Sequence, residues 1–171
     1  MPEFDFASLS LRDALDLALL IEEEAQERYQ EFADNLSLHH TPDAAHFYAD
    51  MAGFEAKHRA AIEARRNALF GDAPMRISST TLWDVEAPEF DQARIYMTAR
   101  EAMEVALASE VKAHDFYDAA LEHVTSPDVR SLFEDLRADE LEHQELIKGM
   151  LARMPPDDDP GDFDEDEPVA Q

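Results

Sequence analysis

The chain has 171 residues, a formal net charge of −26 at pH 7 and no cysteine. This length suffices for one domain whose core folds without disulfide bonds, and the lack of cysteine excludes disulfides and zinc–thiolate or iron–sulfur sites. The negative charge argues against nucleic acid and anionic membranes as partners, because both would be repelled, and favours cations. Because apolar runs such as Leu17–Ile21 are short and no signal sequence opens the chain, we expect a cytoplasmic protein without membrane insertion.

The first half of the chain is expected to form two long helices. Apolar residues recur at intervals of three and four residues, without sustained alternation, which indicates an all-α fold. Capping patterns place the first helix from Ser10 to about Leu36 and the second from Thr41 to about Leu69, with proline at the first position of the second helix.

The second half is expected to repeat this scheme after a long connection. The connection covers residues 71–97 and is predicted to include a short helical piece at about 90–97. The third helix is expected over residues 98–124 and the fourth over 126–154, where two prolines follow. Residues 155–171 hold eight acidic residues and no basic one, which predicts a disordered acidic tail.

The two halves resemble each other closely enough to indicate an internal duplication. Tyr29 follows Glu22 by seven residues, and Tyr117 follows Glu110 by the same interval. Each half also contains a Glu-x-x-His pair whose glutamate follows a helix-opening proline by thirteen residues. The pairs are Glu55 with His58 and Glu140 with His143.

The repeated acidic residues fall on apolar helix faces. Glu22, for example, shares a face with Leu15, Ala18, Ala25 and Tyr29, because helix neighbours on one side are three, four or seven residues apart. Four carboxylates and two imidazoles are therefore expected in one interior, where unpaired charge costs several kcal/mol. Two divalent cations would compensate this charge. Alternatively, the pairs lie on an acidic surface, or the bundle is structural and binds no metal.

Three short motifs carry a resemblance to a known family. "EEEAQERY", which ends at Tyr29, resembles the Glu-x-x-Ala-x-x-Arg-Tyr pattern of the first helix in rubrerythrins. "EAKH" and "ELEH" resemble the two Glu-x-x-His motifs of the same family, which belongs to the ferritin-like superfamily. The resemblance implies a ferritin-like antiparallel four-helix bundle over residues 1–154, made of two helix hairpins at about 8–70 and 98–154 that a long crossover joins.

The resemblance also implies a di-iron centre, in which manganese or zinc could replace iron. Tyr29 and Tyr117 would help to position or protect the bound intermediate, although core packing is the alternative for both. The implied ligands are Glu22, Glu55, His58, Glu110, Glu140 and His143.

Rubrerythrin-like proteins react ferrous iron with hydrogen peroxide or dioxygen, so the resemblance implies a peroxidase or ferroxidase. The alternative is a non-catalytic module that binds iron and delivers it to a partner. Without a cysteine-ligated rubredoxin domain, reductive turnover would need an external electron donor. A homodimer or larger homo-oligomer is expected. Phe90, Ile95 and Met97 are candidate contacts, with packing into the core as the preferred alternative.

One position departs from the family pattern. Rubrerythrins carry a further glutamate three residues after the ligand of the third helix, and this chain has Ala113 there. His114, the next residue, lies about 40° further around the helix from Glu110 and is a candidate substitute.

Overall fold

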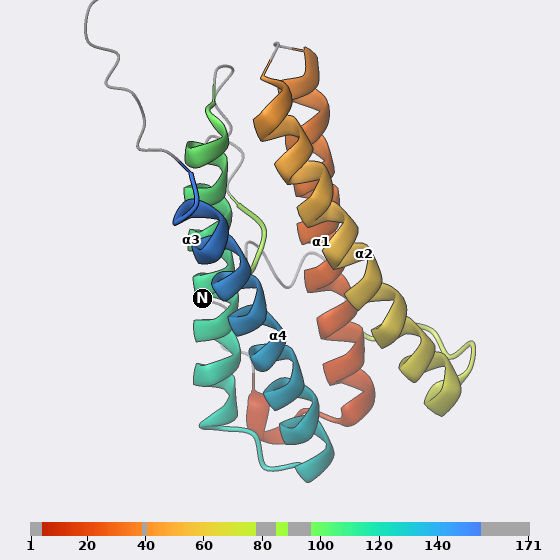
Figure 1. The fold of residues 1–171 in the computed structure, drawn as a ribbon. Helices are drawn as coiled ribbons and strands as arrows, with labels where there is room; N and C mark the ends of the chain where they lie inside the picture. The colour runs from red at the N-terminus through yellow and green to blue at the C-terminus, as the bar shows by residue number, and fades with distance from the viewer. Residues whose placement is uncertain (1–4, 39–40, 78–84, 89–96, 155–171) are drawn as a thin grey trace, which may run out of the picture.

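The computed structural model describes residues 5–38, 41–77, 85–88 and 97–154 (Figure 1). These residues contain helices and no strand, which confirms the all-α prediction. The expected helical piece at 90–97 lies, except for Met97, outside the described residues, as does the acidic tail at 155–171. The elements are the 3-10 helix η1 (Phe6–Ser8) and the α-helices α1 (Leu11–Leu38), α2 (Pro42–Phe70), α3 (Ala99–Leu121) and α4 (Pro127–Leu151).

The four long helices form two antiparallel hairpins that pack side by side (Figure 1). Helix α1 pairs with α2, and α3 pairs with α4. Helix α3 begins at the end of the bundle where α1 ends, so the connection after α2 returns the chain along the bundle before α3 starts (Figure 1). This arrangement is the ferritin-like four-helix bundle predicted from the sequence.

Helix starts follow the local sequence. Thr98 and Glu101 form a complete capping box, in which the Glu101 amide donates to the Thr98 hydroxyl at 3.1 Å and the Thr98 amide donates to the Glu101 carboxylate at 2.8 Å. At α1, the Asp13 amide donates to the Ser10 hydroxyl at 3.2 Å. Thr41 is the N-cap residue of α2, but its side chain accepts no cap hydrogen bond; its hydroxyl donates to the Leu36 carbonyl at 3.0 Å.

Helix α3 ends at Leu121, three residues before the predicted Val124. The side chain of Arg130 on α4 donates to the carbonyl oxygens of Leu121 and Val124, at 3.0 and 2.8 Å. An arginine from the next helix thus satisfies carbonyls at this helix end, so the chain can turn without losing hydrogen bonds. Helix α4 likewise ends at Leu151 rather than at Met154.

Two apolar clusters fill the bundle, and each draws on all four helices. One contains Leu15, Ile62, Leu121 and Phe133 among its members, and the other contains Phe32, Met51, Ala106 and Ile147. All four helices of the chain therefore contribute to one packed interior. On every helix, a stretch that belongs to neither cluster separates the two, and the predicted ligands lie in these stretches, at positions 22, 55 and 58, 110, and 140 and 143.

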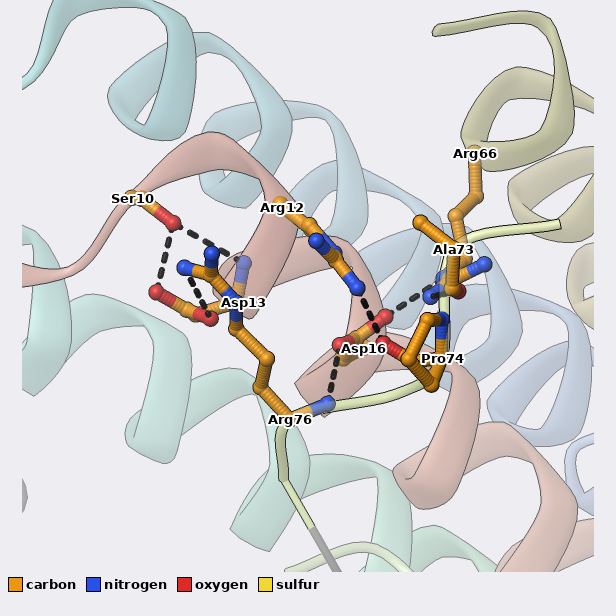
Figure 2. A network of polar contacts seen from close by, with 8 residues as sticks. All are labelled: Ser10, Arg12, Asp13, Asp16, Arg66, Ala73, Pro74 and Arg76. Carbon is orange, nitrogen blue, oxygen red and sulfur yellow. Dashed lines mark hydrogen bonds and ion pairs between the residues drawn. The ribbon is translucent and has the colours of Figure 1, made fainter. Parts of the chain in front are cut away.

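A buried polar network fixes the start of the connection against α1 (Figure 2). Asp16, which is fully buried, accepts hydrogen bonds from Arg66 Nε and from the backbone amide of Arg76, the latter at 2.8 Å. Arg66 also donates to the Ala73 carbonyl at 2.8 Å, and Arg12 donates to the Pro74 carbonyl. These bonds hold residues 73–76 beside the first turns of α1, so the beginning of the connection is part of the folded unit.

None of the helices in the described part of the chain is both long and apolar enough to cross a membrane.

Candidate metal centre

The six residues predicted as ligands come together in the polar layer between the two apolar clusters. The four carboxylates are buried, with at most 1 % of each residue exposed, whereas the His58 side chain is 25 % exposed. The core-facing stripes predicted around them are buried as well, which confirms that the acidic residues share the apolar helix faces. The predicted residues are Glu22, Glu55, His58, Glu110, Glu140 and His143.

One half of the layer contains hydrogen-bonded ligand candidates. The hydroxyl of Tyr29 on α1 donates to Glu110 Oε1 at 2.9 Å, and His143 Nδ1 lies 3.0 Å from Glu110 Oε2. Gln144 Nε2 donates to the backbone carbonyl of Glu110 at 3.2 Å. Glu110 is therefore oriented by three side chains, and Glu140 completes a group in which one ligand atom from each of Glu110, Glu140 and His143 lies within 4.8 Å of the others.

The other half contains carboxylates without hydrogen-bond partners. Both oxygens of Glu22 and both oxygens of Glu55 are buried and accept no hydrogen bond from any described residue. His58 Nδ1 is 3.9 Å from Glu22 and 3.9 Å from Glu55, which is too long for a hydrogen bond. Buried carboxylates normally have a hydrogen-bond or ionic partner, so in this half of the layer either a cation or protons must compensate their charge.

The sequence did not point to Glu86, which lies in the connection before α3. Glu86 is 1 % exposed, and one of its oxygens lies within 4.8 Å of oxygens from Glu22 and Glu55. It belongs to none of the repeated motifs and lies on none of the long helices, so no periodicity placed it in the core. The only signal available in the sequence was a glutamate within the apolar-flanked run Val85-Glu86-Ala87.

Burial raises the pKa of Glu22, Glu55, Glu86 and Glu140 well above the usual range of a glutamate carboxyl. The neighbouring carboxylates of the same layer raise these pKa values further, because each disfavours a second negative charge nearby. Burial lowers the pKa of His58, and its neighbour His143 lowers it further. In the absence of a cation, these raised pKa values favour the protonated forms of Glu22, Glu55, Glu86 and Glu140, and the lowered pKa of His58 favours its neutral form.

The donor set fits two metal ions. The described residues contain three overlapping groups with ligand atoms within 4.8 Å of one another, and every member of these groups is a carboxylate or an imidazole. Such oxygen and nitrogen donors suit iron, manganese and zinc. The buried and unpaired oxygens of Glu22 and Glu55 are the atoms that a cation would satisfy. The groups are Glu22–Glu55–Glu86, Glu55–His58–His143 and Glu110–Glu140–His143.

The two predicted tyrosines occupy equivalent positions in the repeats but make different contacts. Both are fully buried, and burial raises the pKa of both hydroxyls well above the usual range of tyrosine. Tyr29 donates to Glu110, whereas the Tyr117 hydroxyl has no hydrogen-bond partner among the described residues. Duplication of the sequence has therefore not produced duplicate hydrogen bonding.

The other histidines in the part of the chain that the structure describes belong to none of these three ligand groups. His114 belongs to none of the three ligand groups, and its Nδ1 lies 3.2 Å from the neighbouring Asp115 carboxylate. His46 and His123 are exposed, and residues 39–40 lie outside the described range. Ala113 is fully buried in the core.

A four-helix bundle with carboxylates and histidines in a central polar layer defines the class of ferritin-like carboxylate proteins. The rubrerythrin family model matches residues 13–99 and 101–170, nearly the whole sequence. The chain therefore belongs to the rubrerythrin family.

A solved structure supports the same fold. The crystal structure of an uncharacterized conserved protein from Magnetospirillum magnetotacticum MS-1 matches the chain with a TM-score of 0.65 and 30% sequence identity. The match covers 86% of this chain and 97% of that one. No curated protein matches the chain.

Proposed function

We propose that the chain is a di-iron oxidoreductase that reduces hydrogen peroxide or dioxygen at the centre of the bundle. The observation that carries this proposal is the set of buried carboxylate oxygens on Glu22 and Glu55 that accept no hydrogen bond from a described residue. Membership of the rubrerythrin family supports iron as the metal. The candidate ligands are the six predicted residues, with Glu22, Glu55 and His58 from the first repeat and Glu110, Glu140 and His143 from the second.

Two bound Fe(II) ions would supply two electrons, which with two protons reduce one hydrogen peroxide to two waters. Cation binding is favoured at the buried carboxylates, because a bound cation compensates the negative charge that burial otherwise disfavours. Tyr29 orients Glu110 through its hydrogen bond. The Tyr117 hydroxyl has no acceptor among the described residues, so it is available to donate to a bound oxidant. These 171 residues contain no cysteine, so they hold no cysteine-ligated iron site that could return electrons to the centre.

Anaerobic titration with Fe(II), followed by one equivalent of hydrogen peroxide, tests the proposal. Two Fe(II) bound per chain and a fast rise in near-ultraviolet absorption after peroxide addition are the expected results. Slow release of intact Fe(II) without a fast reaction would instead support an iron carrier. No binding of Fe(II) would overturn the proposal altogether.

The fate of the oxidised iron separates a peroxidase from a ferroxidase. A peroxidase keeps both ions and returns to Fe(II) when an external reductant is added. A ferroxidase treats Fe(II) as a substrate and oxidises more than two ions per chain. Repeated additions of peroxide at limiting and at excess Fe(II), with bound iron measured after each step, distinguish the two activities.

A further inference from the structure

Glu86 is a fifth carboxylate in the polar layer, and it reaches the layer from the connection rather than from a helix. Only 1 % of it is exposed, and neither of its oxygens accepts a hydrogen bond from the part of the chain that the structure describes. Its neighbours in the layer are Glu22 and Glu55, whose oxygens also lack partners there. Three unpaired carboxylates in one buried group strongly oppose one another unless a cation or protons are present.

Two cationic side chains hold the backbone on the carboxyl side of Glu86. Lys112 Nζ on α3 donates to the Ala87 carbonyl at 3.2 Å, and Arg28 on α1 donates to the Pro88 carbonyl. All four residues from 85 to 88 are buried. Both cations therefore hold the connection through its backbone, and the positive charge of Lys112 also acts on the Glu86 carboxyl, whose pKa it lowers, although burial and the neighbouring carboxylates raise that pKa more strongly.

The two halves of the layer differ in the polar partners of their carboxylates. In the second repeat, Glu110 accepts from Tyr29 and lies beside His143, so its oxygens have polar neighbours at 2.9 and 3.0 Å. In the first repeat, Glu22 has no such partner, and Tyr117, the equivalent of Tyr29, donates to no described residue. Glu86 has no counterpart in the second half of the layer, because a single connection joins the two repeats.

We infer that Glu86 is a metal ligand, and that the Glu22–Glu55–Glu86 group forms one of the two metal-binding positions of the layer. This inference rests on the proposed metal centre and adds to it a ligand from the connection. The group offers only oxygen atoms, which suits a hard divalent cation such as Mn(II) or Fe(II). The other position retains the Glu110–Glu140–His143 group.

Mn(II) binding to the full chain tests the inference without any redox turnover. Free Mn(II) is measured by electron paramagnetic resonance during titration of the unsubstituted chain, the Glu86→Gln variant and a Glu104→Gln control. Glu104 is an exposed residue of α3, so its substitution removes the same charge away from the layer. We expect Glu86→Gln to weaken one of two Mn(II) equivalents by about tenfold or more and to leave the other unchanged. The control should bind both equivalents as the unsubstituted chain does.

Hydrogen exchange followed by mass spectrometry provides a second measurement that also needs no activity. Adding Mn(II) to the unsubstituted chain should slow amide exchange in residues 85–87, because a bound Glu86 side chain holds that backbone in place. In Glu86→Gln the slowing should be lost at 85–87 but retained around Glu140 on α4. This difference would not arise from a purely structural role of Glu86.

The outcomes separate the two proposals. The role of Glu86 would be overturned if Glu86→Gln bound two Mn(II) equivalents with unchanged affinity. It would also be overturned if Mn(II) did not alter amide exchange at residues 85–87 of the unsubstituted chain. Either result would leave the proposed metal centre intact. Failure of the unsubstituted chain to bind Mn(II) and Fe(II) would overturn both.

Discussion

The imidazole rings of His58 and His143 lie parallel, with their centroids 4.8 Å apart and their planes 4° from each other. They come from α2 and α4 and are equivalent residues of the two repeats. Burial lowers the pKa of His58, and the nearby His143 lowers it further, so the neutral ring is favoured at His58. Neutral imidazole is the form that binds a metal. The contact therefore joins the two Glu-x-x-His motifs in one site and favours the ligand form of His58.

Replacing Glu55 and Glu140 together with glutamine should abolish stabilisation by metal. A ligand present at a hundred times its Kd stabilises the fold by about 2.7 kcal/mol, and this gain should disappear when both carboxylates are lost. Without metal, the variant should be at least as stable as the unsubstituted chain, because two buried carboxylates have been removed.

Thermal unfolding with and without Zn(II) measures both effects. The matched control is Glu63→Gln with Glu134→Gln, which removes two exposed carboxylates from the same two helices. In the control, Zn(II) should raise the unfolding temperature as much as it does in the unsubstituted chain. If Zn(II) raised the unfolding temperature of both double variants equally, the ion would bind elsewhere on the acidic surface.

The stability of the metal-free protein should fall as the pH rises. Glu22, Glu55, Glu86 and Glu140 have raised pKa values in the folded state, so above about pH 4.3 the folded chain binds more protons than the unfolded chain. Their contribution is fully present below the unfolded pKa and is lost as the pH rises through the folded pKa. His58 acts in the opposite direction below about pH 6.5, because its pKa is lowered, but it is a single group.

Urea unfolding in the presence of a chelator, between about pH 5 and about pH 8, tests this dependence. Surface repulsion in a chain of net charge −26 also grows with pH, so the two double variants above separate the causes. Removing Glu55 and Glu140 should flatten the pH dependence more than removing Glu63 and Glu134. Equal slopes would assign the effect to surface charge.

The two buried tyrosines should respond differently to loss of their hydroxyls. Tyr29→Phe removes the hydrogen bond to Glu110, which should cost about 1.5–3 kcal/mol because the acceptor is a carboxylate. Tyr117→Phe removes a hydroxyl that has no partner among the described residues, so it should be neutral or stabilising. The free energy of unfolding of the metal-free variants provides the comparison. A larger loss from Tyr117→Phe than from Tyr29→Phe would contradict these contacts.

Asp16→Ala should destabilise the fold strongly. It leaves the buried Arg66 without its carboxylate partner, and loss of one member of a buried ion pair costs about 3–5 kcal/mol. It also removes the acceptor of the Arg76 amide, which holds the connection beside α1 (Figure 2). Asp13→Ala is the control, since this more exposed carboxylate accepts from the Ser10 hydroxyl at 2.5 Å and lies 3.8 Å from the exposed Arg76 guanidinium, and such surface contacts contribute about 1 kcal/mol or less. Similar midpoints in urea for both variants would argue against the buried network.

Much of the fold follows from local sequence. The predicted ends of the four helices agree with the observed ends to within about three residues. The prediction used the apolar stripes, the capping box at Thr98 and the proline at the start of α2. These signals are local, because helix periodicity and end contacts act over a few positions. The same periodicity put Glu22 and Glu110 on buried faces. As ligands, all six predicted residues stay predictions that metal binding must test.

Other features depend on contacts between distant residues. Both apolar clusters draw on all four helices, so the core depends on residues that are far apart in the sequence. Tyr29 and Tyr117 were given the same expected role, yet among the described residues Tyr29 donates to Glu110 whereas Tyr117 has no acceptor. Glu86 enters the polar layer where Lys112 and Arg28, from two different helices, bind the carbonyls that follow it. No local sequence pattern predicts these contacts, because they form between residues far apart in the chain only when the bundle assembles.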